Sequence, residues 1–164
     1  MTRNLNVRNT NFLSRDAAFI EELEGNKINL SFNHPIKSLH WVIQDSNYLS
    51  NNNLYQNIVF DHLIYDHFDK CNLILNGVER FSSQSAPYFR ALEPYNNEYM
   101  IPKLIQYSNK LIYMYSFSLK PKEYQPSGTC NFSKIDSASL NFTGNLSSDH
   151  TISVYAVNYN ILRI

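Results

Sequence analysis

The stretch Tyr115–Asp136 reads YSFSLKPKEYQPSGTCNFSKID, and its strands and turns decide the fold. It overlaps an apolar, β-branched and aromatic run, Leu111–Leu119, that is typical of a strand. We expect Pro121 to end this strand at Lys120, because proline fixes its own φ and donates no ladder hydrogen bond. The segment therefore predicts a strand, a sharp corner and a return to the sheet over Asn131–Asp136.

The corner itself is predicted at Gln125–Gly128. Pro126 presets φ in a tight turn, and Gly128 accepts a positive φ at no steric cost. We expect this turn to deliver the following segment to the sheet at a fixed angle.

Outward from this stretch, short segments with alternating apolar residues predict further strands. Leu39, Trp41 and Ile43 share one face of their strand, and the Asn76-Gly77 pair is typical of a hairpin turn. The remaining predicted strands and returns are Ile28–Phe32, Lys37–Gln44, Cys71–Leu75, Val78–Phe81, Ser139–Phe142 and Thr151–Tyr159. About seven strands joined by long polar loops favour an all-β fold, a β-sandwich of the jelly-roll kind.

The N-terminal part differs from this pattern. Ser14–Leu23 predicts a short helix, with a serine that can cap and apolar residues spaced three apart. We therefore expect residues 1–25 to form an arm or short helix and residues 26–164 to form the domain. Asp45–Asn57 predicts a long exposed loop, and Ser82–Pro102 an irregular segment with one helical turn.

Composition excludes several functions. The 164 residues suffice for one domain, and 14 basic residues balance 14 acidic ones, so no excess positive charge is available for general nucleic-acid binding. Charged residues are only 17%, whereas 22 Asn and 18 Ser supply much of the polarity. No apolar run approaches the roughly 20 residues that a membrane-spanning helix needs.

Motifs of catalysis and metal binding are weak. Asp61, His62, Asp66, His67 and Asp69 crowd together, but the two histidines diverge on a helix and point to opposite faces of a strand, so we expect no metal site. The chain contains no nucleophile elbow and no phosphate-binding glycine loop. Cys71 and Cys130 match no zinc or redox spacing, and we expect free thiols. No enzyme activity and no cofactor are therefore expected.

The stretch Tyr115–Asp136 closely resembles the signature near the C-terminus of major capsid proteins of nucleocytoplasmic large DNA viruses. Asn33–Lys37 with Leu39 and Trp41 is similar to the family's NHP-x-K-x-L-x-W segment, and Val154–Ile164 is similar to its last strand. The signature residues that we carry over are Asn33, His34, Pro35, Trp41, Tyr88, Phe89, Pro121, Gln125, Pro126, Ser127, Gly128, Asn131 and Ser133.

The resemblance covers about Ile28 to Ile164 and implies the second half of a double jelly roll. It implies a structural protein of an icosahedral capsid that self-assembles into trimeric, pseudo-hexagonal capsomers. The implied partners are copies of itself or of the full-length capsid protein, minor capsid proteins and the internal viral membrane, without direct contact to nucleic acid. The implied location is the virion, with assembly in the host cytoplasm.

The match to the second jelly roll alone leads us to expect a fragment, a split-gene product or a trimmed paralogue. One alternative is a minor or capsid-derived single jelly roll that binds capsomers without forming the shell. Another is a glycan-binding jelly-roll module that uses exposed tyrosines. The structural role of the signature has its own alternative, a monomeric β-sandwich with the same core.

Overall fold

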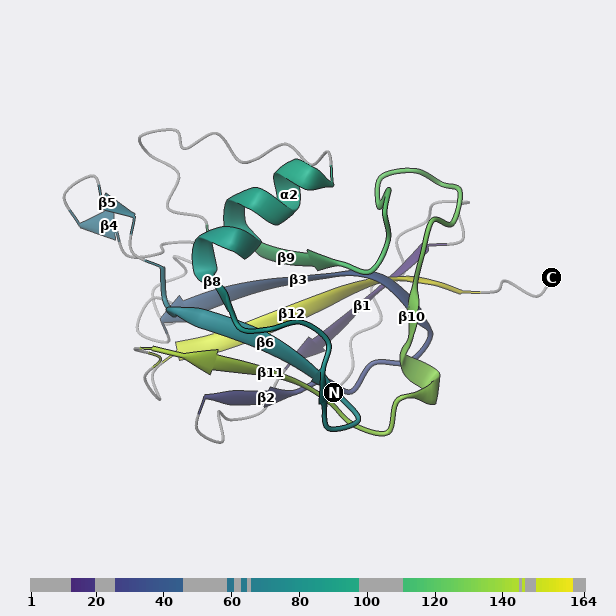
Figure 1. Cartoon of the computed structure of the whole chain (residues 1–164), viewed down its shortest axis with the longest axis horizontal. Coiled ribbons are helices and arrows are strands. Elements are labelled where there is room, and N and C mark those ends of the chain that lie inside the picture. Colours follow the sequence, from purple (N-terminus) through teal and green to yellow (C-terminus); the bar gives the residue numbers. More distant parts are fainter. Residues whose placement is uncertain are drawn as a thin grey trace.

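The computed structural model describes residues 13–19, 26–45, 59–60, 63–64, 66–97, 111–144, 146 and 150–160. Within these residues, two five-stranded antiparallel sheets form a β-sandwich, and a two-stranded hairpin lies at one end (Figure 1). The hairpin pairs β4 (Val59–Phe60) with β5 (Leu63–Ile64).

The first sheet contains the longest strands. Its order is β1 (Leu13–Phe19), β12 (His150–Tyr159), β3 (Pro35–Asp45) and β10 (Cys130–Asn131), and β9 (Tyr113–Ser116) pairs with β3 beside β10. The second sheet has the order β2 (Lys27–Asn29), β11 (Ala138–Thr143), β6 (Lys70–Leu75) and β7 (Val78–Glu79), and β8 (Gln84–Ser85) also pairs with β6.

The pairing is nested along the chain. β1 pairs with β12, β2 with β11, β3 with β9 and β10, and β6 with β7 and β8. The chain thus folds as one long antiparallel ribbon. Successive strand pairs along this ribbon lie alternately in the first and the second sheet. This is the arrangement of a jelly roll, and it confirms the predicted fold class.

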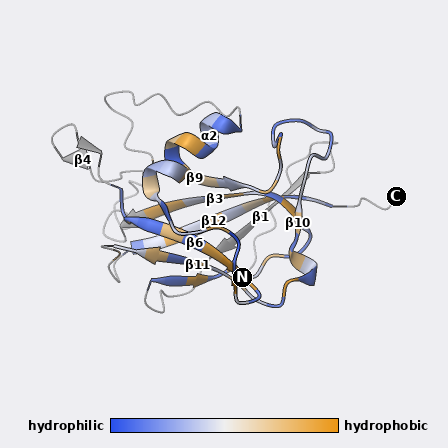
Figure 2. Cartoon of the chain, in the orientation of Figure 1, coloured by the Kyte–Doolittle hydropathy of each residue, from blue (hydrophilic) through white to orange (hydrophobic). Residues whose placement is uncertain are grey.

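The core lies between the two sheets, as the alternation along the strands predicts. Leu39, Trp41 and Ile43 are fully buried, as are Ile28 of β2 and, nearly so, Phe32 just after that strand. Figure 2 shows the same alternation of apolar and polar residues along the ribbons. Large aromatic rings fill the interior: Phe68 packs against Tyr113 and Phe142 at centroid distances of 4.8 and 5.0 Å.

The predicted helix at Ser14–Leu23 is wrong over the residues that the structure describes. Leu13–Phe19 is strand β1, and every residue of it pairs with β12, from Leu13 opposite Tyr159 to Phe19 opposite Ser153. Pairing with a long neighbouring strand outweighs a weak local preference for helix. β1 is one of several described strands that the prediction of about seven strands did not include. Residues 20–23 lie outside the described part, and the division at residue 25 stays a prediction.

Within its described residues, 82–97, the segment predicted as irregular with one helical turn contains a longer helix; residues 98–102 lie outside the described part. Residues 86–96 form a continuous helix in which η1 (Tyr88–Leu92) is a π-helical turn and α2 (Glu93–Asn96) follows it. Pro94 donates no backbone hydrogen bond, and the wider turn before it accommodates its ring. The predicted loop at Asp45–Asn57 lies outside the described residues except for Asp45, which ends β3.

Candidate functional site

At one end of the sandwich, the signature segments Asn33–Pro35 and Asn131–Ser133 interlock. His34 has a φ of 78°, and its N–H donates to Ser133 Oγ at 2.9 Å. The His34 carbonyl accepts from the Phe132 N–H at 3.1 Å, and Pro35 lies opposite Asn131 where β3 meets β10. A residue in the left-handed region thus exchanges hydrogen bonds with a segment about a hundred positions away.

The second segment is shaped by its own side chains. Asn131 Oδ1 caps the short 3₁₀ helix η2 (Phe132–Lys134) by accepting from the Ser133 N–H at 3.1 Å. Phe132 is buried, and its ring meets those of Phe32 and Phe117 edge-on at 6.1 and 5.9 Å. The corner is therefore closed by hydrogen bonds outside and aromatic packing inside.

A surface loop, residues 118–127, rises beside this corner. The Ser118 and Ser127 hydroxyls hydrogen-bond at 2.6 Å across its base, and Ser127 Oγ accepts from the Lys120 N–H at 2.8 Å. Gly128 follows with a φ of 143°, and a Cβ there would lie 2.7 Å from the Phe117 carbonyl oxygen. The positive φ predicted for Gly128 is confirmed.

The two other predictions about this loop need correction. The strand ends at Ser116 rather than Lys120, because Ser116 Oγ bonds both the N–H and the carbonyl of Ser118 and replaces the ladder. The hydrogen-bonded turn lies at Lys120–Glu123, where the Glu123 N–H donates to the Lys120 carbonyl at 3.2 Å and Pro121 takes the second position. Gln125 and Pro126 are exposed instead, and Pro121 is buried.

Lys37 joins the loop to the sheet, although it is not among the signature residues carried over from the resemblance. It is 1% exposed, its Nζ donates to the Glu123 carbonyl oxygen at 2.7 Å, and its ammonium lies 5.5 Å from the Tyr159 ring centroid. Burial lowers the pKa of Lys37. A signal was present, since Lys37 has the same parity along β3 as the buried Leu39 and Trp41.

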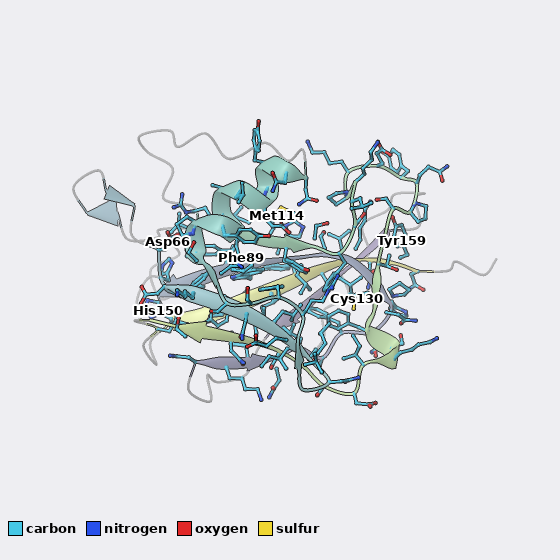
Figure 3. All side chains as sticks on the ribbon, viewed as in Figure 1. Asp66, Phe89, Met114, Cys130, His150 and Tyr159 are labelled. Atoms are coloured by element: carbon cyan, nitrogen blue, oxygen red, sulfur yellow. The ribbon has the colours of Figure 1, made fainter. Side chains whose placement is uncertain are left out.

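The other signature residues lie in the core and under the helix. The Phe89 ring packs on Trp41 at 5.2 Å and on Tyr88 at 5.1 Å, and Figure 3 labels Phe89 at the middle of the molecule. Trp41 also stacks on Tyr113 at 6.0 Å. The carried-over residues therefore form two groups, one at the corner and loop and one in the aromatic core.

A buried carboxyl joins the helix to β9. Glu93 is 7% exposed, and one of its carboxylate oxygens accepts from the Ser116 N–H at 3.3 Å. Burial raises the pKa of Glu93, against the smaller opposing effects of its bonds to the Ser116 N–H and the Tyr88 hydroxyl.

In the cluster of aspartates and histidines between Asp61 and Asp69, the described side chains of Asp66 and His67 contact other parts of the fold. Arg90 forms a bidentate ion pair with Asp66, in which Nε and a terminal guanidinium nitrogen donate to the two carboxylate oxygens at 2.9 and 3.2 Å. The Asp66 carboxylate also accepts from the Tyr113 hydroxyl at 3.0 Å. The His67 ring meets that of His150 edge-on at 5.6 Å. Asp61 and His62 lie outside the described residues, and within those residues no three His, Cys, Asp or Glu side chains gather as metal ligands would.

Two remaining features concern the cysteine thiols and the helices of the described residues. Cys71 is buried and Cys130 is partly buried, and both are free, as predicted. No helix in the ranges that the structure describes is long and apolar enough to cross a membrane.

The nested strands define a jelly-roll β-sandwich, and solved viral capsid proteins have the same fold. The Faustovirus major capsid protein superposes with a TM-score of 0.68 at 15% identity, covering 93% of this chain and 34% of that one. The PBCV-1 virus capsid model superposes with a TM-score of 0.61 at 23% identity, covering 90% of this chain and 46% of that one. At these identities the likeness shows the fold alone.

Sequence relatives give the family. The sequence model of a protein family described as large eukaryotic DNA virus major capsid protein matches residues 1–164. The major capsid protein of Pyramimonas orientalis virus is 37% identical over 161 residues, covering 88% of this chain and 38% of that protein. That of Paramecium bursaria Chlorella virus 1 is 30% identical over 182 residues, covering 84% of this chain and 40% of that protein.

The chain belongs to the large eukaryotic DNA virus major capsid protein family. This is a family of structural proteins of the virion capsid rather than of enzymes. The chain spans about two fifths of the length of these two relatives.

Proposed function

We propose that this chain is a shell-forming jelly roll that assembles into trimeric, pseudo-hexagonal capsomers of an icosahedral capsid. The observation that carries the proposal is the nested pairing of the described strands in the two five-stranded sheets, from β1 with β12 inward to β6 with β7 and β8. A β-sandwich closed in this way is a rigid block that keeps its shape when it packs against identical neighbours. We further propose that the partner jelly rolls come from copies of this chain or of the full-length capsid protein.

The surface chemistry supports assembly through broad polar contacts. Charged residues are 17% of the chain, and the described residues include two ion pairs within the chain, Arg90–Asp66 and Lys120–Glu123. Asn, Ser and Tyr contribute hydrogen bonds at an interface without the desolvation cost of an unpaired charge. This composition suits contacts between copies that carry no net charge.

The remaining partners follow from the same proposal. Minor capsid proteins and the membrane beneath the shell would contact the assembled capsomers, and nucleic acid would not contact this chain directly, since its 14 basic and 14 acidic residues cancel. The described residues give the glycan-binding alternative no support, because their exposed tyrosines, Tyr95, Tyr124 and Tyr155, lie on three separate elements.

The experiment measures the mass of the assembled particle. The chain is purified alone and together with the first jelly roll of a relative, and size-exclusion chromatography with light scattering is run over a range of concentrations. We expect three copies per particle in at least one of the two preparations. A strictly monomeric chain in both, at every concentration, would contradict the proposal and favour a single jelly roll that binds finished capsomers.

A further inference from the structure

The 118–127 loop has little apolar contact with the sandwich beside it. Its two large apolar side chains, Leu119 and Tyr124, are 84% and 73% exposed. Among residues 119–126, Pro121 is buried and the others are exposed. Figure 1 shows the loop between β9 and β10, at the end of the molecule opposite the β4–β5 hairpin. Few buried apolar contacts and an exposed backbone are typical of a segment that opens locally while the rest of the protein stays folded.

The loop contacts a buried charge. Lys37 is 1% exposed, its Nζ donates to the Glu123 carbonyl oxygen at 2.7 Å, and its ammonium lies 5.5 Å from the Tyr159 ring centroid. No carboxylate of the described residues pairs with this ammonium. One carbonyl and one ring replace only part of the water that an ammonium with three N–H donors loses on burial. Burial lowers the pKa of Lys37 for the same reason.

A second polar group beside Lys37 is also poorly matched. The Tyr159 hydroxyl is buried, and no group of the described residues forms a hydrogen bond with it. Lys37 lies on β3 and Tyr159 ends β12, so both groups belong to the first sheet at the end that the loop contacts. Water that reaches Lys37 when the loop opens restores hydrogen bonds that the closed loop denies it, which lowers the free energy of the open form.

The loop keeps part of its own structure when it moves. The Glu123 N–H bond to the Lys120 carbonyl and the ion pair between the same two side chains, both 3.2 Å long, lie within the loop. Opening therefore breaks the bond from Lys37 and exposes Pro121, but leaves this turn in place. Gly128, with a φ of 143°, ends the loop in a backbone region that glycine reaches easily, and it serves as a hinge.

We propose that the 118–127 loop is a lid that opens and closes over Lys37 while the two sheets stay paired. In the closed form the ammonium is covered, and in the open form it is solvated and adds a positive charge to this end of the domain. The proposal concerns a single chain and does not depend on the proposed function.

The test measures how fast an amine-reactive reagent labels Lys37 in the full chain, with peptide mass spectrometry to assign the site. Cys71, which is fully buried, is labelled with a thiol reagent in parallel and reports unfolding of the sandwich. For each residue, the rate in the folded chain is divided by the rate in strong denaturant. We expect this ratio to be at least about tenfold larger for Lys37 than for Cys71. It should not depend on low concentrations of denaturant, because opening the lid exposes little surface.

A pair of proline variants tests whether the lid is what covers Lys37. Pro121→Ala removes about two methylene groups of buried apolar surface, so we expect the labelling rate of Lys37 to rise roughly tenfold. Pro126→Ala is the matched control, because Pro126 is an exposed proline of the same loop, and it should change the rate little.

The inference is overturned if Lys37 and Cys71 give the same ratio with the same dependence on denaturant, because Lys37 then becomes accessible only when the sandwich unfolds. It is also overturned if Pro126→Ala raises the labelling rate as much as Pro121→Ala does. If Pro121→Ala does not fold, the wild-type ratios still decide. All of these measurements use the chain alone, so their outcome is separate from that of the particle-mass experiment.

Discussion

At the scale of single residues, the backbone around Gly128 leaves no room for a side chain. Its φ of 143° is in a region that L side chains rarely adopt, and a Cβ would lie 2.7 Å from the Phe117 carbonyl oxygen. We expect Gly128→Ala to lower the free energy of unfolding by about 2–4 kcal/mol, the sum of backbone strain and overpacking. Chemical denaturation followed by tryptophan fluorescence measures this loss.

The control for this prediction is Gly77→Ala. Gly77 has a φ of 79°, but a Cβ there would have no atom within 4 Å. Gly77→Ala should therefore lower the free energy of unfolding by only about 1–2 kcal/mol, through backbone strain alone. Equal losses for the two variants would show that the close approach at Gly128 is relieved by movement of the loop.

Glu93 gives the fold a pH dependence of defined sign. Burial raises the pKa of its carboxyl, so the folded chain binds this proton more tightly than the unfolded chain. The contribution of this group to the free energy of unfolding is complete below the unfolded pKa, about 4.3, and is lost as the pH rises through the folded pKa. Glu93→Gln stays neutral, so it should be more stable than wild type at neutral pH.

The measurement is the thermal midpoint of both proteins over a series of pH values. We expect the advantage of Glu93→Gln to shrink as the pH falls and to vanish under acid conditions, where wild type is neutral too. A variant that is less stable than wild type at neutral pH would mean that the ionised carboxylate's bonds to the Ser116 N–H and the Tyr88 hydroxyl outweigh its burial.

At the scale of elements, the Asn76 side chain adds to the backbone bonds that join the β6–β7 turn to the segment just before β11. Asn76 Oδ1 accepts from the Asp136 and Ser137 N–H groups at 2.9 and 3.0 Å, and Asn76 has a φ of 50°. Asn76→Ala removes both acceptor bonds and the preference for this backbone region. We expect a loss of about 2 kcal/mol in the free energy of unfolding.

A matched control for Asn76→Ala is Asn72→Ala on the same hairpin. Asn72 makes an exposed hydrogen bond to Glu79 at 2.7 Å, which contributes little in water. Urea denaturation of the two variants separates them. If Asn72→Ala costs as much as Asn76→Ala, the hairpin is stabilised by its own side chains and not by its bonds to the segment before β11.

The elements that alternation predicts well are those with one buried face. In β3 the period of two places Leu39, Trp41 and Ile43 in the core, and the Asn76-Gly77 turn forms with both φ values positive. The N-terminal segment was mispredicted because its apolar spacing fits a helix locally, whereas its partner strand β12 lies about 140 residues further along the chain. Pairing across that separation leaves no local signal.

The candidate site was predictable in part. The resemblance identified the segments that interlock, and the alternation along β3 could have identified Lys37 as buried. The bond between the His34 N–H and Ser133 Oγ joins residues 99 positions apart, which local sequence does not reveal. The turn lies at Lys120–Glu123 and not at the predicted Gln125–Gly128, because Lys37 and Ser127 bond to the loop from outside the turn. Such tertiary contacts decide among turns that are equally good locally.

At the scale of the whole molecule, the reactivity of the Cys71 thiol measures how often the two sheets of the sandwich separate. It is fully buried between the sheets, and burial raises the pKa of its thiol, whereas Cys130 is only partly buried. We expect a thiol reagent to label Cys130 under native conditions and Cys71 only when the sheets separate. In Cys130→Ser, the labelling rate of Cys71 should rise with denaturant as steeply as the unfolding equilibrium does.

Mass spectrometry of labelled peptides assigns the two sites. Labelling of Cys71 at a rate independent of denaturant would contradict this prediction, because it would require a local opening that leaves both sheets intact.

The nested pairing also sets the order of events during synthesis. β1 has its only described strand partner in β12, so the first sheet cannot close until residue 159 has left the ribosome. Such long sequence separations slow folding, because the loop must close before the contacts that stabilise it can form. A growing chain meanwhile holds β3 and β6 without their central partners, exposing strand edges that other chains can pair with. Translation and folding are thereby separated in time, and a stalled or truncated chain is a substrate for chaperones rather than for assembly.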